Sequence, residues 1–334
     1  MTQPDTYLAL DGENVVIRKA NDELSRLPLH NLEGIVAFGY TGASPALMNA
    51  CANRDIDLCF ITQSGRFLAR VAGEVRGNVL LRHRQHQIYD SEMESLNIAK
   101  NIIAGKIYNT RWVLERMLRD HEMRVDVSSI KEVSLLLKQA VDESYRSMDL
   151  EQLRGIEGIA AERYFGVFDH LILQNKDYFT FNGRNRRPPL DAINSLLSFA
   201  YVLLARETAS ALESVGLDPY IGFLHRIRPG RTSLALDLME ELRAVIADRF
   251  VLTLINKREV GKEDFIKREN GAVILQDDAR LIVLRAWQTH KQETLSHPFL
   301  NENISWGLVP YAQALLLARY LRGDLDEYPP FMWK

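Results

Sequence analysis

The sequence predicts an α+β protein with a mainly β N-terminal domain over residues 1–80 and a larger all-α-helical domain over residues 81–334. A chain of 334 residues is long enough to bury two hydrophobic cores. Its 46% hydrophobic and 25% charged residues are typical of a globular protein. Near residue 80 the apolar spacing changes from the short runs of strands to the longer period of helices, which places the boundary there.

Short apolar runs between turn residues predict the strands of the N-terminal domain. We expect strands in YLALD (7–11), VVIRK (15–19), GIVAFG (34–39), DLCFITQSG (57–65) and RFLARVAG (66–73). One helix is expected over SPALMNACANR (44–54). Cys51 and Cys59 form no CxxC pair, so we expect reduced core residues rather than a zinc ribbon or a disulfide framework.

Beyond residue 80 the apolar residues recur at helical spacing over long windows. These windows are YNTRWVLERMLRDH (108–121), VSSIKEVSLLLKQAV (127–141), INSLLSFAYVLLARETASALESV (193–215) and LMEELRAVIADRFVLTLI (238–255). The N-terminus has no basic region followed by an apolar one, and the most apolar run, LLSFAYVLLA at 196–205, is too short to span a bilayer. We therefore expect a cytoplasmic protein with no membrane partner.

Basic residues gather in three islands although the net charge is only −3. The first island covers residues 66–86, and the other two consist of Arg184, Arg186 and Arg187 and of Arg226, Arg228 and Arg231. A local patch of this kind can bind a polyanion such as DNA. Such islands also occur on proteins that bind no nucleic acid, so a solubility role remains open for them.

The segment 151–172 places a carboxylate on an apolar helix face. In a helix, Glu157 shares a face with Ala161, Tyr164 and Phe168, at spacings of 4, 7 and 11 residues. A buried, unpaired carboxylate costs several kcal/mol, so such groups are protonated, paired or bound to a metal. The alternative is an ion pair with an arginine such as Arg154, or a cap at the helix start.

The stretch GFLHRIRPGRTSLALDLMEELR (222–243) combines a histidine with three acids. In a helix that begins near residue 233 and is capped by Thr232 or Ser233, Asp237 and Glu240 project from one side, roughly 5–6 Å apart at Cβ. His225, in the preceding loop, can fold back over the first turn.

A histidine with carboxylate oxygens, and without cysteine, suits Mg²⁺ or Mn²⁺ better than structural zinc. In the alternative, Asp237, Glu240 and Glu241 form a solvated helix face near an N-terminus, where the helix dipole favours acids. Neither charge nor spacing decides between a metal site and this solvated face.

At this point the motifs resemble a known family. LRGIEG (153–158), AERYF (161–165), NSLLSFAYVLLA (194–205) and DPYIGFLHRIRPGRTSLALDLMEELR (218–243) occur in the order and spacing of CRISPR-associated protein one, the adaptation endonuclease and integrase. The resemblance extends to LDGENVVIRK (10–19), LPLHNLEGIVAFGYTGASPALM (27–48) and WGLVPYAQALLLARYLRGDLDEYPPFMWK (306–334), which are similar to the subtype I-C branch.

The resemblance implies roles for individual residues. Glu157, His225 and Asp237 match the family's metal-binding and catalytic residues, and Glu240 stands where relatives often carry a further acid near the metal. Glu241 ranks below Glu240 and is expected to be a solvated charge. The arginines of the 184–187 and 226–231 islands are then the expected DNA contacts, whereas Tyr164 and Tyr201 fit core positions better.

The family also implies an activity and partners. We expect a divalent-metal-dependent endonuclease and integrase that inserts short foreign DNA fragments into a CRISPR array by strand transfer. The N-terminal domain would form a homodimer, and dimers would assemble around the small second CRISPR adaptation protein on double-stranded and branched DNA. An auxiliary nuclease that trims DNA ends is a further partner.

Two other function classes remain open from the residues alone. The first is a DNA-binding scaffold with an inactive metal site, and the second is a metal phosphohydrolase that acts on small nucleotides. The sequence contains no GxxxxGK[ST], HExxH or GxSxG motif, which argues against the commoner nucleotide-binding, zinc-protease and serine-hydrolase sites.

Overall fold

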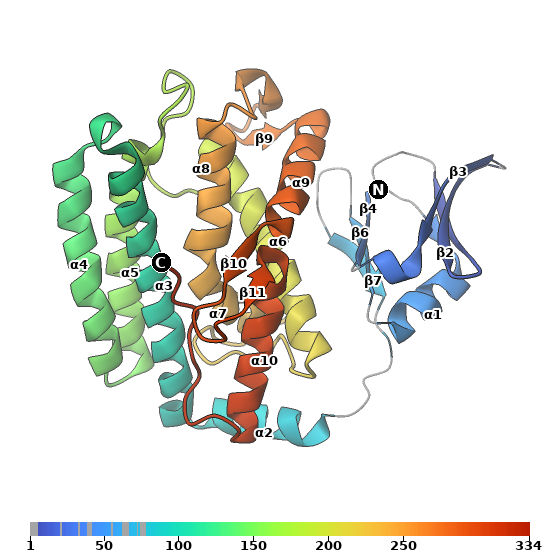
Figure 1. The fold of residues 1–334 in the computed structure, drawn as a ribbon, viewed down its shortest axis with the longest axis horizontal. Coiled ribbons are helices and arrows are strands. Elements are labelled where there is room, and N and C mark those ends of the chain that lie inside the picture. The colour runs from blue at the N-terminus through green and yellow to red at the C-terminus, as the bar shows by residue number, and fades with distance from the viewer. Residues whose placement is uncertain are drawn as a thin grey trace. The chain divides into compact units, whose positions relative to one another are not determined.

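The computed structural model describes residues 6–20, 22–32, 34–38, 42–54, 56–61, 67–71, 73 and 78–334 (Figure 1). The chain divides into two compact units, residues 1–77 and 78–334, and each is described by itself. No helix among the described residues is long and apolar enough to cross a membrane.

The N-terminal unit contains two small sheets and one helix. The first sheet has the order β3-β2-β1-β5 and is antiparallel except for the parallel pair of β1 with β5. The second has the order β4-β6-β7, with β4 parallel and β7 antiparallel to β6. The elements are β1 (Tyr7–Asp11), β2 (Asn14–Lys19), β3 (Asp22–Pro28), η1 (Leu29–Asn31), β4 (Gly34–Phe38), β5 (Gly42–Ala43), α1 (Pro45–Asn53), β6 (Asp57–Ile61) and β7 (Phe67–Val71).

The helix and the strands predicted over 7–11 and 15–19 are present, as are the described parts of the strands predicted over 34–39, 57–65 and 66–73; residues 39, 62–66 and 72 lie outside the described residues. Helix α1 begins after Ser44, whose side chain accepts a hydrogen bond from the Leu47 amide, and Pro45 occupies the first turn, where its missing amide proton costs nothing. Leu47 and Cys51 face the core of the unit, and Cys59 on β6 is also buried, as expected. Strands β3 and β5 were not predicted; β3 is almost entirely exposed and β5 has only two residues.

The second unit is mostly helical. Its helices are α2 (Val79–Asp90), α3 (Glu92–His121), α4 (Val127–Arg146), α5 (Leu150–Gly166), α6 (Ala192–Ser214), α7 (Ser233–Leu242), α8 (Arg249–Asn256), α9 (Asp277–Gln292) and α10 (Val309–Arg322). The shorter turns are η2 (Glu122–Arg124), η3 (Phe168–Leu171), η4 (Arg243–Asp248), η5 (Lys262–Asp264) and η6 (Trp306–Leu308). The all-helical prediction missed two small hairpins, β8 (Phe265–Lys267) with β9 (Val273–Leu275) and β10 (Thr294–Ser296) with β11 (Asn303–Ser305). Three-residue strands are too short for alternation to be visible in a sequence.

The helices start where polar residues supply a cap. The side chains of Ser91, Asp126, Asp149 and Asp191 each accept a hydrogen bond from a backbone amide in the first turn of α3, α4, α5 and α6, respectively. Each cap satisfies an amide that has no partner within its helix. Helix α3 packs against α4, α5 and α7, and Figure 1 shows α3, α4 and α5 side by side.

Helices α7 and α8 form one continuous helical segment interrupted by a π-helical turn, η4. The wider turn shifts the register between the flanking helices, and such turns are frequent at functional sites. It begins with Arg243 and ends with Asp248, and both residues line one pocket. This segment positions five of the charged residues discussed below, Asp237, Glu240, Glu241, Arg243 and Asp248.

Candidate metal centre

Three elements of the helical unit bring acids and a histidine to one pocket. Glu157 comes from α5, His225 from the loop before α7, and Glu240 from the last turn of α7. The pocket has a volume of about 460 Å³. It is lined by Glu151, Arg154, Glu157, Leu224, His225, Arg226, Arg228, Arg231 and Glu240. Residues separated by up to 89 positions in the sequence thus share one site.

Asp237 is fully buried beneath the pocket, and both of its oxygens are already used. Oδ2 accepts hydrogen bonds from the amides of Phe223 (2.6 Å) and Leu224 (3.0 Å). Oδ1 accepts from the His225 amide at 2.9 Å and lies 2.6 Å from His225 Nδ1. The expectation that Asp237 binds a metal directly requires an oxygen that is not committed to these donors. In this arrangement Asp237 folds the 223–225 loop onto α7.

The contact with Asp237 fixes the imidazole of His225. A carboxylate accepts hydrogen bonds, so Nδ1 must carry the proton in this pair. The other nitrogen, Nε2, then has a free lone pair in neutral histidine. Carboxylate–histidine pairs of this kind orient many metal-binding imidazoles. His225 is therefore prepared to offer Nε2 to a cation, with Asp237 behind it.

Gly222 is required for this loop to approach the helix. A Cβ at this position would lie 2.6 Å from Asp237 Oδ2 and 2.7 Å from the backbone carbon of Ser233. Real Cβ atoms do not approach other atoms so closely, so only glycine fits here. The helix cap expected from Thr232 or Ser233 does not form: Thr232 makes no side-chain cap, and the Ser233 hydroxyl instead donates to the Arg226 carbonyl.

Lys106 on α3 connects the two glutamates of the site. Its Nζ forms a hydrogen-bonded ion pair with Glu157 Oε1 and lies 2.7 Å from Glu240 Oε2. Arg243 donates to the other oxygen of Glu240 at 2.6 Å. Burial opposes ionisation of Glu240, but the charges of Arg243 and Lys106 outweigh it and lower the pKa of this carboxyl to about 2. Glu240 is therefore a carboxylate at neutral pH.

The donor set fits a hard divalent cation. Carboxylate oxygens from Glu157 and Glu240 and an imidazole nitrogen are ligands that Mg²⁺ and Mn²⁺ accept. Oε2 of Glu240 is buried and receives no well-directed hydrogen bond from any described residue, in spite of the nearby Lys106 amine. No three His, Cys, Asp or Glu side chains within the described ranges are already arranged around a common metal position.

Two alternatives left open for the acids are excluded. Glu157 pairs with Lys106 rather than with Arg154, which instead pairs with Glu151 and donates to the Leu224 carbonyl. Asp237, Glu240 and Glu241 do not form a solvated helix face, since their exposed fractions are 0%, 4% and 0%. Glu241, expected to be a solvated charge, points to the C-terminal segment and accepts hydrogen bonds from Tyr328, Gln313 and the Phe331 amide.

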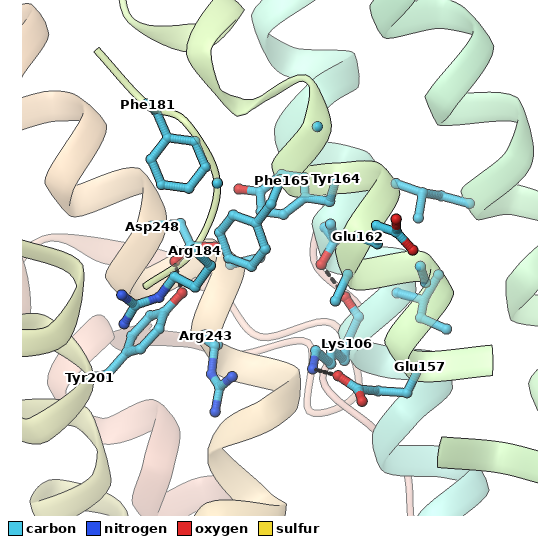
Figure 2. A pocket seen from close by; sticks show the side chains of 18 of the residues that line it. Lys106, Glu157, Glu162, Tyr164, Phe165, Phe181, Arg184, Tyr201, Arg243 and Asp248 are labelled. Carbon is cyan, nitrogen blue, oxygen red and sulfur yellow. Dashed lines mark hydrogen bonds and ion pairs between the residues drawn. The ribbon is translucent and has the colours of Figure 1, made fainter. Parts of the chain in front are cut away.

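A second cavity of about 660 Å³ adjoins the same residues (Figure 2). Figure 2 shows Lys106 and Glu157 directed at one another at one end, with Arg184, Tyr201 and Asp248 grouped at the other. The Tyr201 hydroxyl donates to Asp248 at 2.6 Å, and burial raises the pKa of Asp248 to about 6. Tyr164 and Tyr201 both line this cavity, and Tyr164 is also buried in the hydrophobic core, as expected.

The predicted basic islands differ in how free their guanidinium groups are. Arg184 stacks over Tyr201 and donates to the Asn194 side chain at 2.6 Å, so its guanidinium serves the protein's own structure. Arg186 and Arg187 are exposed. In the other island, Arg226 and Arg228 are exposed and Arg231 is partly exposed, and all three line the pocket of His225. Arg66 and Arg76 of the first island lie outside the described residues.

Lys106, Arg243 and Asp248 were missed by sequence reasoning. Lys106 lies 51 positions before its partner Glu157, and no local sequence pattern predicts a pair so far apart. The acids of the α7 segment drew attention to that helix, but Arg243 was given no role. An arginine three residues after Glu240 has the spacing of an ion pair on one helix face, and this signal was available.

Comparison with known proteins assigns the chain to a family. A model of the family "CRISPR associated protein Cas1" matches residues 1–289. The CRISPR-associated endonuclease Cas1 2 of Rhodospirillum rubrum is 49% identical over 342 residues, covering 100% of this chain and 97% of its own. The CRISPR-associated endonuclease Cas1 1 of Chlorobaculum tepidum is 46% identical over 334 residues with the same coverage. A CRISPR-associated exonuclease Cas4/endonuclease Cas1 fusion of Geobacter sulfurreducens is 35% identical and spans 98% of this chain, which corresponds to 59% of the fusion.

Solved structures agree on the fold. A casposase bound to its integration product superposes with a TM-score of 0.82 at 23% identity, covering 98% of this chain and 92% of its own. A Cas6-RT-Cas1–Cas2 complex gives 0.80 at 23% identity, covering 100% of this chain and 36% of its own. A Cas1 protein of Thermotoga maritima gives 0.79 at 22% identity, covering 95% and 94%. These likenesses confirm the predicted α+β fold, and the two relatives at 46% and 49% identity confirm the predicted class of enzyme, a nuclease. The chain therefore belongs to the CRISPR-associated protein Cas1 family.

Proposed function

We propose that this protein acts in CRISPR adaptation and inserts short foreign DNA fragments into a CRISPR array by phosphodiester strand transfer. With the 3′-hydroxyl of a DNA fragment as nucleophile the reaction is integration, and with water it is endonucleolytic cleavage. Family membership over the whole chain supports this activity. The observation that carries the proposal for the site is the shared pocket of Glu157, His225 and Glu240, bordered by the arginines of residues 226–231.

The ligands that we propose for a divalent ion are the carboxylates of Glu157 and Glu240 and Nε2 of His225. Asp237 then acts as a positioning residue, because its oxygens already hold the loop and His225 Nδ1. A bound Mg²⁺ or Mn²⁺ supplies Lewis-acid stabilisation of the charge that develops on the scissile phosphate. The family is one of divalent-metal nucleases, and the choice between these two ions is part of the proposal.

The arginines beside the pocket are proposed to bind the DNA backbone. Arg226, Arg228 and Arg231 line the same pocket as His225, so a phosphate contacted by them is close to His225. Arg186 and Arg187 are exposed and can extend this surface, whereas Arg184 contributes by holding Tyr201 and the 183–185 turn. Binding of this kind fixes the position of the DNA without reading its sequence.

Partners and context are likewise proposals. We infer a homodimer formed through the N-terminal unit, catalysis in the helical unit, and assembly with the small second adaptation protein on double-stranded and branched DNA in the prokaryotic cytoplasm. A Cas1–Cas2 complex among similar structures and a Cas4–Cas1 fusion among relatives support a second adaptation protein and an end-trimming nuclease as partners. We also retain the subtype I-C branch as a proposal, on the sequence motifs alone.

Manganese-dependent nicking and disintegration of branched DNA test the proposed site. We expect Glu157→Ala, His225→Ala and Glu240→Ala to fall to background, and Asp237→Ala to lose about 10- to 100-fold, the range typical of residues that orient a ligand. Glu132→Ala on the exposed face of α4 is the matched control and should retain full activity. Full activity in all site variants would refute the site. If the wild-type protein binds DNA but does not nick it, the alternative of a DNA-binding scaffold with an inactive metal site is favoured.

A further inference from the structure

Lys106 stands out as a cation inside the proposed metal site. Its side chain is 10% exposed, and its Nζ contacts Glu157 and Glu240, which are two of the three proposed ligands. It comes from a third helix, α3, so its position does not follow from the motifs that carry the acids. The inference below rests on the proposed function, because it uses the same two carboxylates.

We propose that Lys106 is a built-in counter-cation that occupies the metal position and must be displaced when a divalent ion binds. The lysine neutralises and holds the two glutamates while the site contains no metal. It thereby competes with the metal for the same oxygens and sets the concentration at which the metal binds. Lys106 is a positioning residue in this account and not a metal ligand.

The distances from Lys106 Nζ to the two glutamates imply that the lysine and a metal ion compete for the same oxygens. A divalent ion of this class bonds to carboxylate oxygen at about 2.0–2.2 Å. Lys106 Nζ lies 2.7 Å from Glu240 Oε2 and is also hydrogen-bonded to Glu157 Oε1. An ion bonded to both oxygens would have to enter the space that the ammonium group fills between them, and two cations would then be in contact. The lysine must therefore leave one or both carboxylates when the ion enters.

The absence of a preformed site has the same cause. No three acidic, histidine or cysteine side chains in the described part of the chain surround a common metal position. Glu157 and Glu240 are instead oriented toward the amine of Lys106, which lies between them. Glu240 Oε2 is buried and lies 2.7 Å from that amine, so the lysine occupies the side from which a cation would reach this oxygen. The arrangement is that of a metal site filled by a monovalent substitute.

The structure also provides space for the displaced side chain. Lys106 lines the cavity of about 660 Å³ that adjoins the site, and Figure 2 shows it at the edge of this space. A lysine side chain has a flexible four-carbon stem, so its amine can move by rotation without a shift of α3. Arg243 remains on the other oxygen of Glu240 throughout and keeps that carboxylate ionised. Displacement thus needs only one side chain to rotate.

Manganese binding to metal-stripped protein tests the proposal without reference to activity. We would measure Mn²⁺ affinity by calorimetry and by the loss of the free-ion electron paramagnetic resonance signal, at one pH and ionic strength. Lys106→Met and Lys106→Gln should bind Mn²⁺ about 10- to 100-fold more tightly than wild type, the ratio expected when one charge-assisted hydrogen bond no longer has to be broken. Lys138→Met removes an exposed lysine of α4 and should leave the affinity unchanged.

A second measurement separates competition from a merely structural role. Mn²⁺ should raise the melting temperature of Lys106→Gln by more than it raises that of wild type, because stabilisation by a ligand grows with its affinity. If Lys106 only supported the fold, Lys106→Gln would have a lower melting temperature than wild type both with and without Mn²⁺. Its affinity for Mn²⁺ would then be unchanged. Wild-type or weaker Mn²⁺ affinity in both Lys106 variants would overturn the proposal.

Failure of the proposed metal site gives a different pattern. Glu157→Gln should weaken Mn²⁺ binding strongly if the site is correct. Weak binding by Glu157→Gln together with wild-type affinity in the Lys106 variants refutes the role of Lys106 and leaves the metal site intact. Wild-type affinity in Glu157→Gln as well refutes the metal site and the role of Lys106 with it.

Discussion

Glu241→Gln should destabilise the helical unit at acidic pH and stabilise it at alkaline pH, because it removes one buried titrating carboxyl group. Glu241 is fully buried and accepts hydrogen bonds from Tyr328 (2.5 Å), Gln313 (2.8 Å) and the Phe331 amide (3.0 Å). Burial outweighs these bonds and raises the pKa of Glu241 from 4.5 to about 7. The carboxyl therefore holds its proton more tightly in the folded than in the unfolded protein.

The magnitude follows from the size of this shift. A pKa raised from 4.5 to about 7 corresponds to a free energy of about 3 kcal/mol, since each pH unit is worth about 1.4 kcal/mol. Because the folded pKa is raised, this stability is fully present below the unfolded pKa of about 4.5 and is lost as the pH rises through about 7. Glutamine does not titrate but places an amide donor against the Phe331 amide, which costs about 1 kcal/mol at every pH.

Together, the cost of burying the Glu241 charge and the cost of the glutamine amide predict that the stability curves of variant and wild type cross as the pH rises. Glu241→Gln should be less stable than wild type by about 1 kcal/mol at pH 4.5 and more stable by about 2 kcal/mol at pH 8.5. Urea unfolding followed by tryptophan fluorescence measures this difference, and all four tryptophans lie in the helical unit. The experiment uses metal-free protein, with the exposed Glu132→Gln as control. A difference between variant and wild type that stays constant over this range would refute the raised pKa.

Two further predictions concern the loop and the basic surface. Gly222→Ala should destabilise the helical unit by about 3 kcal/mol, because the added Cβ would collide with Asp237 and the backbone of α7. Gly155→Ala has open space around the added Cβ and should stabilise α5 by about 0.5–1 kcal/mol. The midpoints of urea unfolding measure both effects, and equal effects of the two variants would contradict the packing of the loop. Replacing the three arginines of residues 226–231 by glutamine should reduce the slope of log affinity for DNA against log salt by up to about 3, and an unchanged slope would remove this surface from the DNA-binding site.

Much of the fold was predictable because long amphipathic windows leave a strong periodic signal. The four helical windows correspond to parts of α3, α4 and α6 and to the continuous segment of α7, η4 and α8. The starts were less predictable: α3 begins at Glu92, well before the predicted window at 108, and the one predicted cap, at Thr232 or Ser233, does not form. The hairpins of β8 to β11 were not predictable in the same way, because each strand has three residues and pairs only through tertiary context.

The site was predictable only in part. Glu157 and His225 were found because a carboxylate on an apolar face and a lone histidine before a helix are unusual patterns, and both line the pocket. The spacing of Asp237 and Glu240 was read correctly as one helix side, but it does not reveal that the first holds a loop while the second lies in the pocket. Such a division depends on which segment folds over each carboxylate, and that is a tertiary property.

Glu241 shows the limit most clearly. Adjacent residues on a helix point about 100° apart, so Glu240 and Glu241 cannot share surroundings. An acid at this position normally faces solvent, as we expected. Here the C-terminal segment, residues 328–334, donates two hydrogen bonds to the carboxyl group, from the Tyr328 hydroxyl and the Phe331 amide, and Gln313 of α10 donates a third. Contacts between positions about 90 residues apart are invisible to local patterns.

The coordination of a bound metal tests the central claim most directly. We would determine a crystal structure of the metal-stripped protein soaked with Mn²⁺ and locate the ion by its anomalous signal. The account predicts an ion bonded to Glu157, to Glu240 and to Nε2 of His225, with Asp237 still hydrogen-bonded to Nδ1 and the Lys106 amine withdrawn. An ion bonded to an oxygen of Asp237, or one that leaves Glu240 paired with Lys106, would contradict it.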